Sequence, residues 1–218
     1  MDVSLEAIVL WGVPVVLAIT LHEAAHGYVA RIFGDPTAQM LGRVTLNPIK
    51  HIDPVGTILV PAVLLLMAKL AGGPAFLFGW AKPVPVNHAN LRHPRRDMIW
   101  VAAAGPASNF VQALLWALLL VALLGGGARS SAGLVQMAQI GVNMNLLLMA
   151  LNLLPIPPLD GGRMLSGLLP PRAADALARV EPYGLFVILA LLATGLLHPM
   201  MRPLISGAES VILLLLGR

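Results

Sequence analysis

Residues 18–34, AITLHEAAHGYVARIFG, place two histidines and a glutamate within one of the most apolar parts of an apolar chain. Of the 218 residues, 58% are hydrophobic and only 11% are charged, and the mean hydropathy is +0.83. A soluble domain is roughly one quarter charged residues. The composition therefore predicts a membrane protein in which these titratable side chains lie where water is scarce.

Apolar runs of membrane-spanning length recur along the chain. A helix needs about 20 apolar residues to cross a bilayer at 1.5 Å per residue. Four segments have this length or nearly so, and a fifth is shorter: about 4–33, 98–124, 133–154, 182–198 and 204–217. A further apolar stretch, 55–79, is interrupted by Gly72, Gly73 and Pro74. We therefore expect residues 1–218 to form a single all-α polytopic membrane domain with five to six transmembrane helices.

The charged residues and the cysteine count exclude several classes of protein. The net charge of +4 is too small and too dispersed for a nucleic-acid-binding surface, and it is typical of Lys and Arg at the cytoplasmic face of a membrane. The absence of cysteine excludes disulfides and thiolate metal sites. Asp2 and Glu6 stand where a signal peptide carries positive charge, so the first apolar segment is predicted to be a retained helix.

The motif HEAAH predicts a metal site within the first of these helices. His22 and His26 are four positions apart, so they share one helix face one turn apart. This spacing suits two imidazole ligands of one Zn²⁺, and it leaves Glu23 free to accept a proton from water. An ionisable side chain deep in a membrane costs roughly 2.5–3.5 kcal/mol on insertion scales and is therefore usually functional.

A zinc site needs at least one more protein ligand, and Asp160 is the strongest candidate. Catalytic zinc sites commonly use three protein ligands. Asp160 follows the proline-rich segment NLLPIPPL and precedes two glycines, and such non-helical backbone is tolerated at membrane depth only where it is buried or lines a wet cavity. The remaining histidines and most of the remaining acids are predicted to be solvated side chains of loops or helix ends, namely His51, His88, His93, His198, Asp35, Asp53, Asp97, Asp175, Glu181 and Glu209.

Three motifs together resemble a known family. HEAAH, GPASN and NLLPIPPLDGG occur in this order on three successive major spans. This set is similar to that of the site-2 protease family of intramembrane zinc metalloproteases, and above all to small bacterial members without PDZ or CBS domains. The resemblance covers about residues 18–165. It implies one Zn²⁺ per chain, with the ligands His22, His26 and Asp160. It further implies Glu23 as general base and Asn152 as a residue that holds the substrate or the oxyanion.

Two other elements match the family less specifically. The GPASN element is matched by Gly105, Pro106 and Asn109. Its small residues let helices approach closely, and packing alone would explain it equally well. Residues 79–87, GWAKPVPVN, resemble a re-entrant strand beside the active site, which predicts a short β-like membrane-associated loop. Within it, Lys82 and Asn87 are equally consistent with a role as interfacial anchors.

The segment 55–79 is an apolar stretch that the smallest relatives lack, and it decides the topology. The resemblance requires the HEAAH and GPASN helices to run in opposite directions. We therefore expect 55–79 to form a re-entrant hairpin, or two short crossings, that turns near Gly72, Gly73 and Pro74. With the N-terminus outside, the cytoplasmic side then receives all 14 Lys and Arg residues except two, Arg129 and Arg202. The two motif histidines lie about 10–17 Å from the cytoplasmic end of their helix.

The resemblance implies an intramembrane zinc metalloprotease of the bacterial inner membrane. Its partners are a transmembrane protein substrate and the lipid bilayer, without nucleic acid, and the sequence leaves the oligomeric state open. The catalytic core is expected at about 4–165 and C-terminal helices at about 180–217. A metal-ion transporter or channel is the alternative, with His22, His26 and Asp160 as an ion site. Transport needs neither Glu23 nor Asn152, so these two residues favour the protease.

Overall fold

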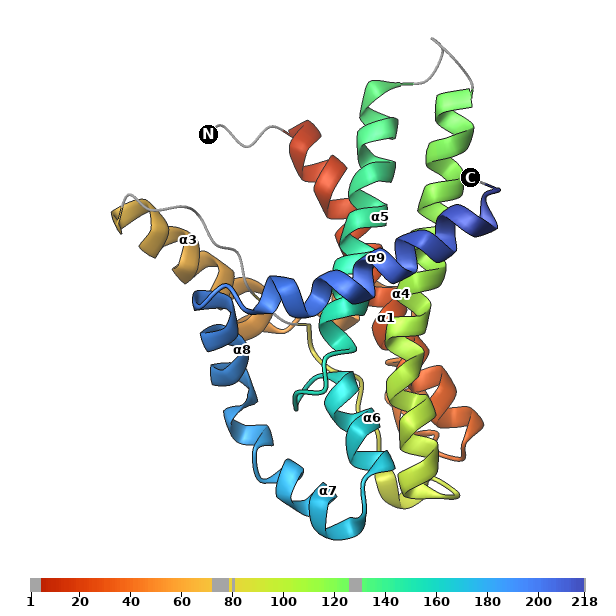
Figure 1. The fold of residues 1–218 in the computed structure, drawn as a ribbon, viewed down its shortest axis with the longest axis vertical. Coiled ribbons are helices and arrows are strands. Elements are labelled where there is room, and N and C mark those ends of the chain that lie inside the picture. Colours follow the sequence, from red (N-terminus) through yellow and green to blue (C-terminus); the bar gives the residue numbers. More distant parts are fainter. Residues whose placement is uncertain (1–4, 72–78, 80, 126–130, 218) are drawn as a thin grey trace.

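The computed structural model describes residues 5–71, 79, 81–125 and 131–217, and in these residues the chain forms helices joined by loops, without a strand (Figure 1). The α-helices are α1 (Leu5–Ile32), α2 (Thr37–Met40), α3 (Val60–Ala71), α4 (Pro94–Gly125), α5 (Ala132–Asn152), α6 (Asp160–Leu168), α7 (Pro171–Ala178), α8 (Gly184–Ala193) and α9 (Leu197–Leu215). Short 3₁₀ turns are η1 (Pro48–His51), η3 (His88–Asn90) and η5 (Glu181–Tyr183), and η2 (Pro54–Leu59) is a π-helix. The predicted all-α class is confirmed.

Within the described residues, four helical segments are long and apolar enough to cross a membrane, as expected of a multi-pass integral membrane protein. They are Ile8–Ile32, Pro94–Gly125, Ala132–Asn152 and Pro171–Ala193. The first three coincide with predicted spans. The fourth begins before the predicted residue 182 because α7 and η5 run directly into α8.

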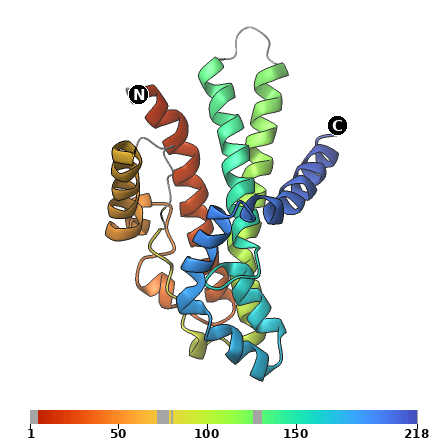
Figure 2. The same ribbon diagram turned by 60° about the vertical axis from the view of Figure 1, so that its left-hand side comes forward.

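Helices α1, α4 and α5 form the central bundle (Figures 1 and 2). The N-terminus of α1 lies at the same end of the bundle as the C-terminus of α4, so these two helices run in opposite directions, as the sequence predicts. A buried core joins α4, α5 and α9, with the members Ala113, Ala117, Leu146, Met149 and Ile212. Small side chains such as these alanines allow close helix contact.

Two chain breaks bring the ends of helices together. Gly34 has a φ of +108°, which ends α1 and lets the N–H of Asp35 donate to the Ala30 carbonyl at 2.9 Å. At the end of α5 the chain turns through Pro155 to Pro158, which include a cis Pro157–Pro158 peptide bond, and α6 begins at Asp160. A Cβ at position 161 would clash with the carbonyls of residues 153 and 154, so only glycine permits this close approach.

The segment between α1 and α4 is only partly described. Within the apolar stretch 55–79, the residues up to Ala71 lie in η2 and α3. The predicted turn at Gly72, Gly73 and Pro74 lies outside the described residues. Residues 81–87 form neither a helix nor a strand ladder, so the predicted β-like character is limited to an unpaired segment. Pro83 and Pro85 lack the N–H groups that a ladder needs.

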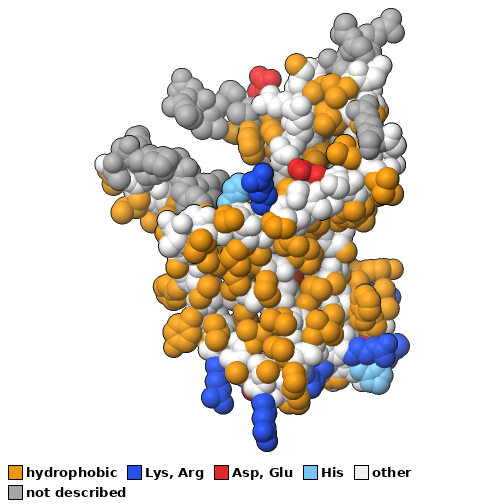
Figure 3. All heavy atoms as spheres, in the orientation of Figure 1, with side chains coloured by type: hydrophobic (Ala, Val, Ile, Leu, Met, Phe, Trp, Pro, Cys, Tyr) orange, Lys and Arg blue, Asp and Glu red, His pale blue; other side chains and the backbone are white. Residues whose placement is uncertain are grey.

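The surface is that expected of a chain surrounded by lipid. Figure 3 shows hydrophobic side chains over the middle of the visible face, whereas most of the Lys and Arg side chains gather at its lower end. Large apolar side chains on the outside of α4 are exposed, including Leu115 and Leu118. Exposed apolar surface of this extent is appropriate for helices in a bilayer and not for a soluble monomer.

Candidate metal centre

The structure brings three predicted residues, His22, His26 and Asp160, to one buried point. The Nε2 atoms of His22 and His26 lie 3.0 Å apart. Oδ2 of Asp160 lies 3.1 Å from the first of these nitrogens and 3.3 Å from the second. Helix α1 supplies both histidines, and Asp160 is the first residue of α6. These side chains form a group that could hold one metal ion.

The far side of each imidazole ring faces a hydrogen-bond acceptor. Nδ1 of His22 lies 2.6 Å from Oδ1 of Asn109, and Nδ1 of His26 lies 2.7 Å from the Val101 carbonyl. A neutral imidazole has one N–H, and these acceptors assign it to Nδ1 in both rings. Each Nε2 therefore turns a lone pair towards the other ring and towards Asp160. This is the arrangement in which outer partners orient metal-binding histidines.

The residues present fit a divalent cation. Oδ2 of Asp160 is buried and has no hydrogen-bond donor in the described part of the chain. Three converging acceptor atoms repel one another unless a positive charge lies between them. Gly105 of α4 faces the same point, because a Cβ there would clash with the rings of His22 and His26. A set of two imidazoles and one carboxylate suits zinc.

The GPASN element thus does more than pack helices. Gly105 leaves room for the two histidine rings, and Asn109 contacts one of them directly. Pro106 and Asn109 are both buried within α4. The sequence left packing and function equally open for this element. The contacts of Gly105 and Asn109 favour a role in shaping the metal centre.

Glu23 and Asn152 line the small cavity of about 130 Å³ that contains the three clustered side chains. Glu23 is not part of the cluster, and its Oε2 accepts a hydrogen bond from the Val84 N–H at 2.7 Å. The amide nitrogen of Asn152 donates to the Leu148 carbonyl at 3.0 Å. This bond uses one of its two amide hydrogens. One oxygen of Glu23 and one amide hydrogen of Asn152 are therefore available for chemistry in the cavity.

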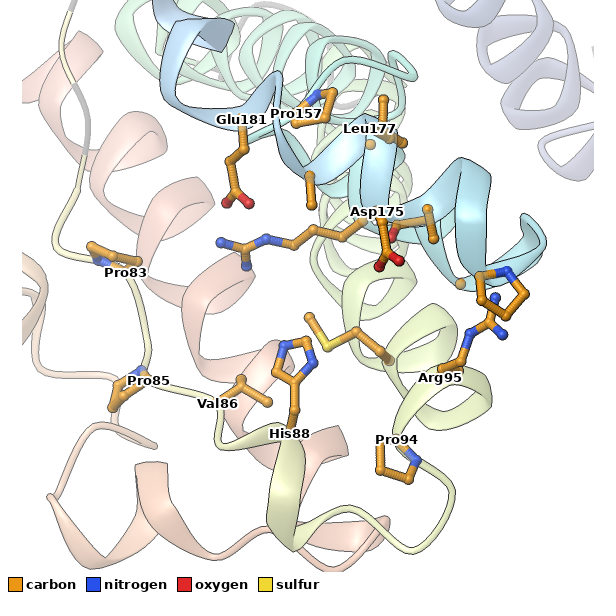
Figure 4. Close-up of a pocket in the computed structure, with 18 of the residues that line it drawn as sticks. Pro83, Pro85, Val86, His88, Pro94, Arg95, Pro157, Asp175, Leu177 and Glu181 are labelled. Carbon is orange, nitrogen blue, oxygen red and sulfur yellow. The ribbon is translucent and has the colours of Figure 1, made fainter.

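A larger cavity of about 710 Å³ adjoins the small one. Residues lining both cavities include Val84, Val86, Met98 and Arg163. Figure 4 shows Pro83, Pro85, Val86 and His88 along one wall of the larger cavity, with Asp175 and Glu181 on the opposite wall. The segment 83–88 thus borders both cavities.

The prediction of solvated side chains is wrong for His51, Asp35 and Asp97, which are all buried. Asp97 accepts a hydrogen bond from the His93 N–H at 2.7 Å at the start of α4, and Nε2 of His51 lies 3.1 Å from the Thr45 carbonyl. Asp97 and His51 contact backbone groups four and six residues away, whereas Asp35 is covered by residues 87–90 from further along the chain. The other predicted surface histidines, His88, His93 and His198, are exposed.

Asp35 is the hub of a second polar cluster, which the sequence did not indicate. Its carboxylate accepts hydrogen bonds from the backbone N–H and hydroxyl of Thr37, from the Asn87 N–H and from the side chain of Asn90. Burial acts to raise the pKa of Asp35, but these hydrogen bonds outweigh it, so the pKa lies below its ordinary value. The cluster ties the loop after α1 to the end of segment 83–88.

Asn145 was also missed by the sequence reasoning. It is fully buried in α5, and its Oδ1 accepts a hydrogen bond from Asn109 at 2.9 Å. A polar residue in the middle of an apolar span is the signal that could have identified it.

Comparisons with known proteins agree with the arrangement of the site. The sequence profile of Peptidase family M50 matches residues 124–195. A Bacillus subtilis (strain 168) protein named "Putative zinc metalloprotease YwhC" is 41% identical over 205 residues, which cover 92% of this chain and 88% of that protein. A Mycolicibacterium smegmatis protein named "Putative zinc metalloprotease Rip2" is 30% identical over 185 residues, covering 84% of this chain and 66% of its own length. No solved structure matches the chain significantly.

Proposed function

The chain belongs to peptidase family M50, the site-2 protease family, and is a zinc metalloendopeptidase; we propose that it cleaves peptide bonds within or near transmembrane segments of membrane proteins. One observation carries the proposal. His22 and His26 lie on an apolar helix of membrane-spanning length and meet Asp160 in a buried cluster that could hold one metal ion, beside the separate carboxylate of Glu23.

We assign His22, His26 and Asp160 as the ligands of one zinc ion per chain. When bound, zinc supplies a Lewis acid that polarises the scissile carbonyl and makes water more acidic. The hydrogen bond from Val84 to Oε2 orients Glu23, so that its other oxygen can accept a proton from water and later pass it to the leaving amine. The free amide hydrogen of Asn152 is available to stabilise the oxyanion that develops on the carbonyl.

The substrate is proposed to bind as an unwound segment along residues 83–87. A transmembrane helix uses its carbonyls in its own hydrogen bonds, so cleavage requires local unwinding. Segment 83–87 borders both cavities, and the larger one has room for several residues of extended chain. Pro83 and Pro85 offer no N–H, and the N–H of Val84 already binds Glu23. Pairing with substrate would therefore rely on the carbonyls of this segment and on the N–H of Val86.

The proposed topology places the N-terminus outside and the metal centre in the inner half of a bacterial inner membrane. Five to six transmembrane helices result when α9 is counted and 55–79 forms a re-entrant hairpin. The antiparallel directions of α1 and α4 support this arrangement. Residues 1–218 then act as a single peptidase domain, with the catalytic core at about 4–165 and C-terminal helices at about 180–217.

The test compares the membrane proteomes of cells that carry the wild-type protein or the Glu23→Gln variant. We expect one or a few membrane proteins to accumulate uncut in the variant, and their wild-type fragments to end within or next to a transmembrane segment. Zinc uptake into proteoliposomes containing the purified protein examines the transporter alternative. If the wild-type protein and the Glu23→Gln variant both transport zinc, and membrane-protein fragments do not differ between the two kinds of cell, the protein is a transporter and not a protease.

A further inference from the structure

A chain of buried amides connects helix α5 to the ring of His22. Asn145 donates from Nδ2 to the Gly141 carbonyl at 2.9 Å and accepts at Oδ1 from Nδ2 of Asn109, also at 2.9 Å. Asn109 in turn accepts at Oδ1 from Nδ1 of His22 at 2.6 Å. Both asparagines are fully buried. Three helices are thus linked through side-chain amides on the outer side of the metal centre.

Backbone carbonyls fix the orientation of both side-chain amides. A carbonyl only accepts, so the Gly141 carbonyl requires the NH₂ group of Asn145 and leaves its Oδ1 pointing to Asn109. The Ala18 carbonyl, 3.2 Å from Nδ2 of Asn109, orients the second amide in the same sense. Only the oxygen of Asn109 can then face His22. The ring hydrogen is held on Nδ1, and the lone pair of Nε2 points to the metal centre.

We propose that Asn145 is a positioning residue that holds His22 in its metal-binding form through Asn109. The inference rests on the proposed role of His22 as a zinc ligand. A buried amide is costly in an apolar helix unless it is fully hydrogen-bonded, and here every bond of Asn145 serves the orientation of Asn109 or is made within its own helix. Asn145 therefore controls metal affinity without contacting the metal centre.

The consequence of losing Asn145 follows from the same geometry. Without its Oδ1, one amide hydrogen of Asn109 has no acceptor, and the amide can rotate to present NH₂ to His22. The ring must then accept at Nδ1 and carry its hydrogen on Nε2, where it opposes a metal ion. The Ala18 carbonyl remains as a partial restraint. The effect of Asn145 on zinc affinity is therefore expected to be smaller than that of Asn109, which contacts His22 directly.

The experiment measures the zinc affinity of the full chain in detergent, by competition with a chelator of known affinity. Loss of an outer partner costs about 10–100-fold in metal affinity, which we expect for Asn109→Leu, and we expect about 3–10-fold for Asn145→Leu. Asn143→Leu is the matched control, because Asn143 is an exposed asparagine on the same helix. Gln112→Leu controls for loss of a buried amide in α4 that shares the Ala18 carbonyl with Asn109 but contacts neither His22 nor Asn145. Neither control should change zinc affinity.

A second variant, Asn145→Thr, separates the positioning role from a structural one. The threonine hydroxyl still donates to the Gly141 carbonyl, one turn earlier, but it is too short to reach Asn109. We expect reduced zinc affinity in this variant even where Asn145→Leu folds poorly. Nitrogen NMR of the metal-free protein, labelled at histidine, should show the hydrogen of His22 confined to Nδ1 in the wild type and shared between both nitrogens in the variants.

The outcomes separate the inference from the proposed function. Wild-type protein that binds no zinc contradicts the proposed function itself. Wild-type protein that binds zinc no more tightly than both Asn145 variants overturns only the inference, and a loss of thermal stability alone then assigns Asn145 to packing.

Discussion

Asp35 and Asp160 are both buried carboxylates, and their surroundings are opposite. Asp35 receives hydrogen bonds at both oxygens from residues of two loops. Oδ2 of Asp160 receives none in the described structure and faces two imidazole nitrogens. A carboxylate whose acceptors are satisfied anchors the fold, whereas one that faces further lone pairs requires a cation. The partners of a buried acid, and not its burial, indicate its function.

The largest effect is expected from loss of a proposed ligand. Asp160→Ala and His26→Ala should each lose the zinc ion and all peptide cleavage, with a fall in metal affinity beyond the roughly 100-fold that loss of an outer partner costs. Metal analysis of purified protein measures this. His93→Ala is the control, because His93 is exposed and lies outside the cluster. One zinc per chain in Asp160→Ala would break the comparison, since this carboxylate would then not need a cation.

Glu23 sharpens the comparison because it combines features of both aspartates. One of its oxygens is held by the Val84 N–H, as those of Asp35 are held by their donors, and the other is available in the cavity. Glu23→Gln keeps an oxygen for Val84 but cannot accept a proton. We expect about one zinc per chain and a loss of cleavage of about 10²–10⁴-fold. Metal analysis and a cleavage assay on the same preparation decide the matter. Zinc lost from Glu23→Gln as completely as from His26→Ala would make Glu23 a ligand instead of a base.

A smaller effect is expected when the satisfied carboxylate is removed. Asp35→Ala leaves the N–H groups of Thr37 and Asn87, whose bonds to Asp35 are partly buried, without this acceptor, which costs at most about 1–3 kcal/mol of unfolding free energy. Zinc content should stay unchanged, and cleavage should fall in part because segment 83–87 is less well held. Thermal unfolding and metal analysis measure the two quantities. Glu209→Ala is the control, because Glu209 is exposed and lines neither cavity. Loss of zinc from Asp35→Ala would remove the distinction between the two aspartates.

The sequence predicted the site better than its surroundings. The four-residue spacing of HEAAH and the proline break before Asp160 depend on local chain geometry, so His22, His26 and Asp160 could be selected as candidate ligands without the fold, and the structure brings them together. Asp35 and Asn145 each also have a partner more than 30 residues away along the chain, Asn87 and Asn109 respectively. Local patterns carry no information on such contacts.

The smallest expected effect is the pH dependence of the Asp35 contribution. Hydrogen bonds from Thr37, Asn90 and Asn87 outweigh burial and lower the pKa of Asp35 in the folded chain below the ordinary value of about 3.9. A carboxyl group that is more acidic in the folded state stabilises the fold above its unfolded pKa, and this stabilisation is lost as the pH falls through the folded pKa. The stability difference between wild type and Asp35→Asn should therefore be constant from about pH 7 to pH 5 and shrink below about pH 4. Unfolding of the metal-free protein at each pH measures it, since the zinc ligands then add no metal-dependent change. A difference that grows as the pH falls would show that Asp35 is less acidic in the folded chain, and thus that its donors do not compensate for burial.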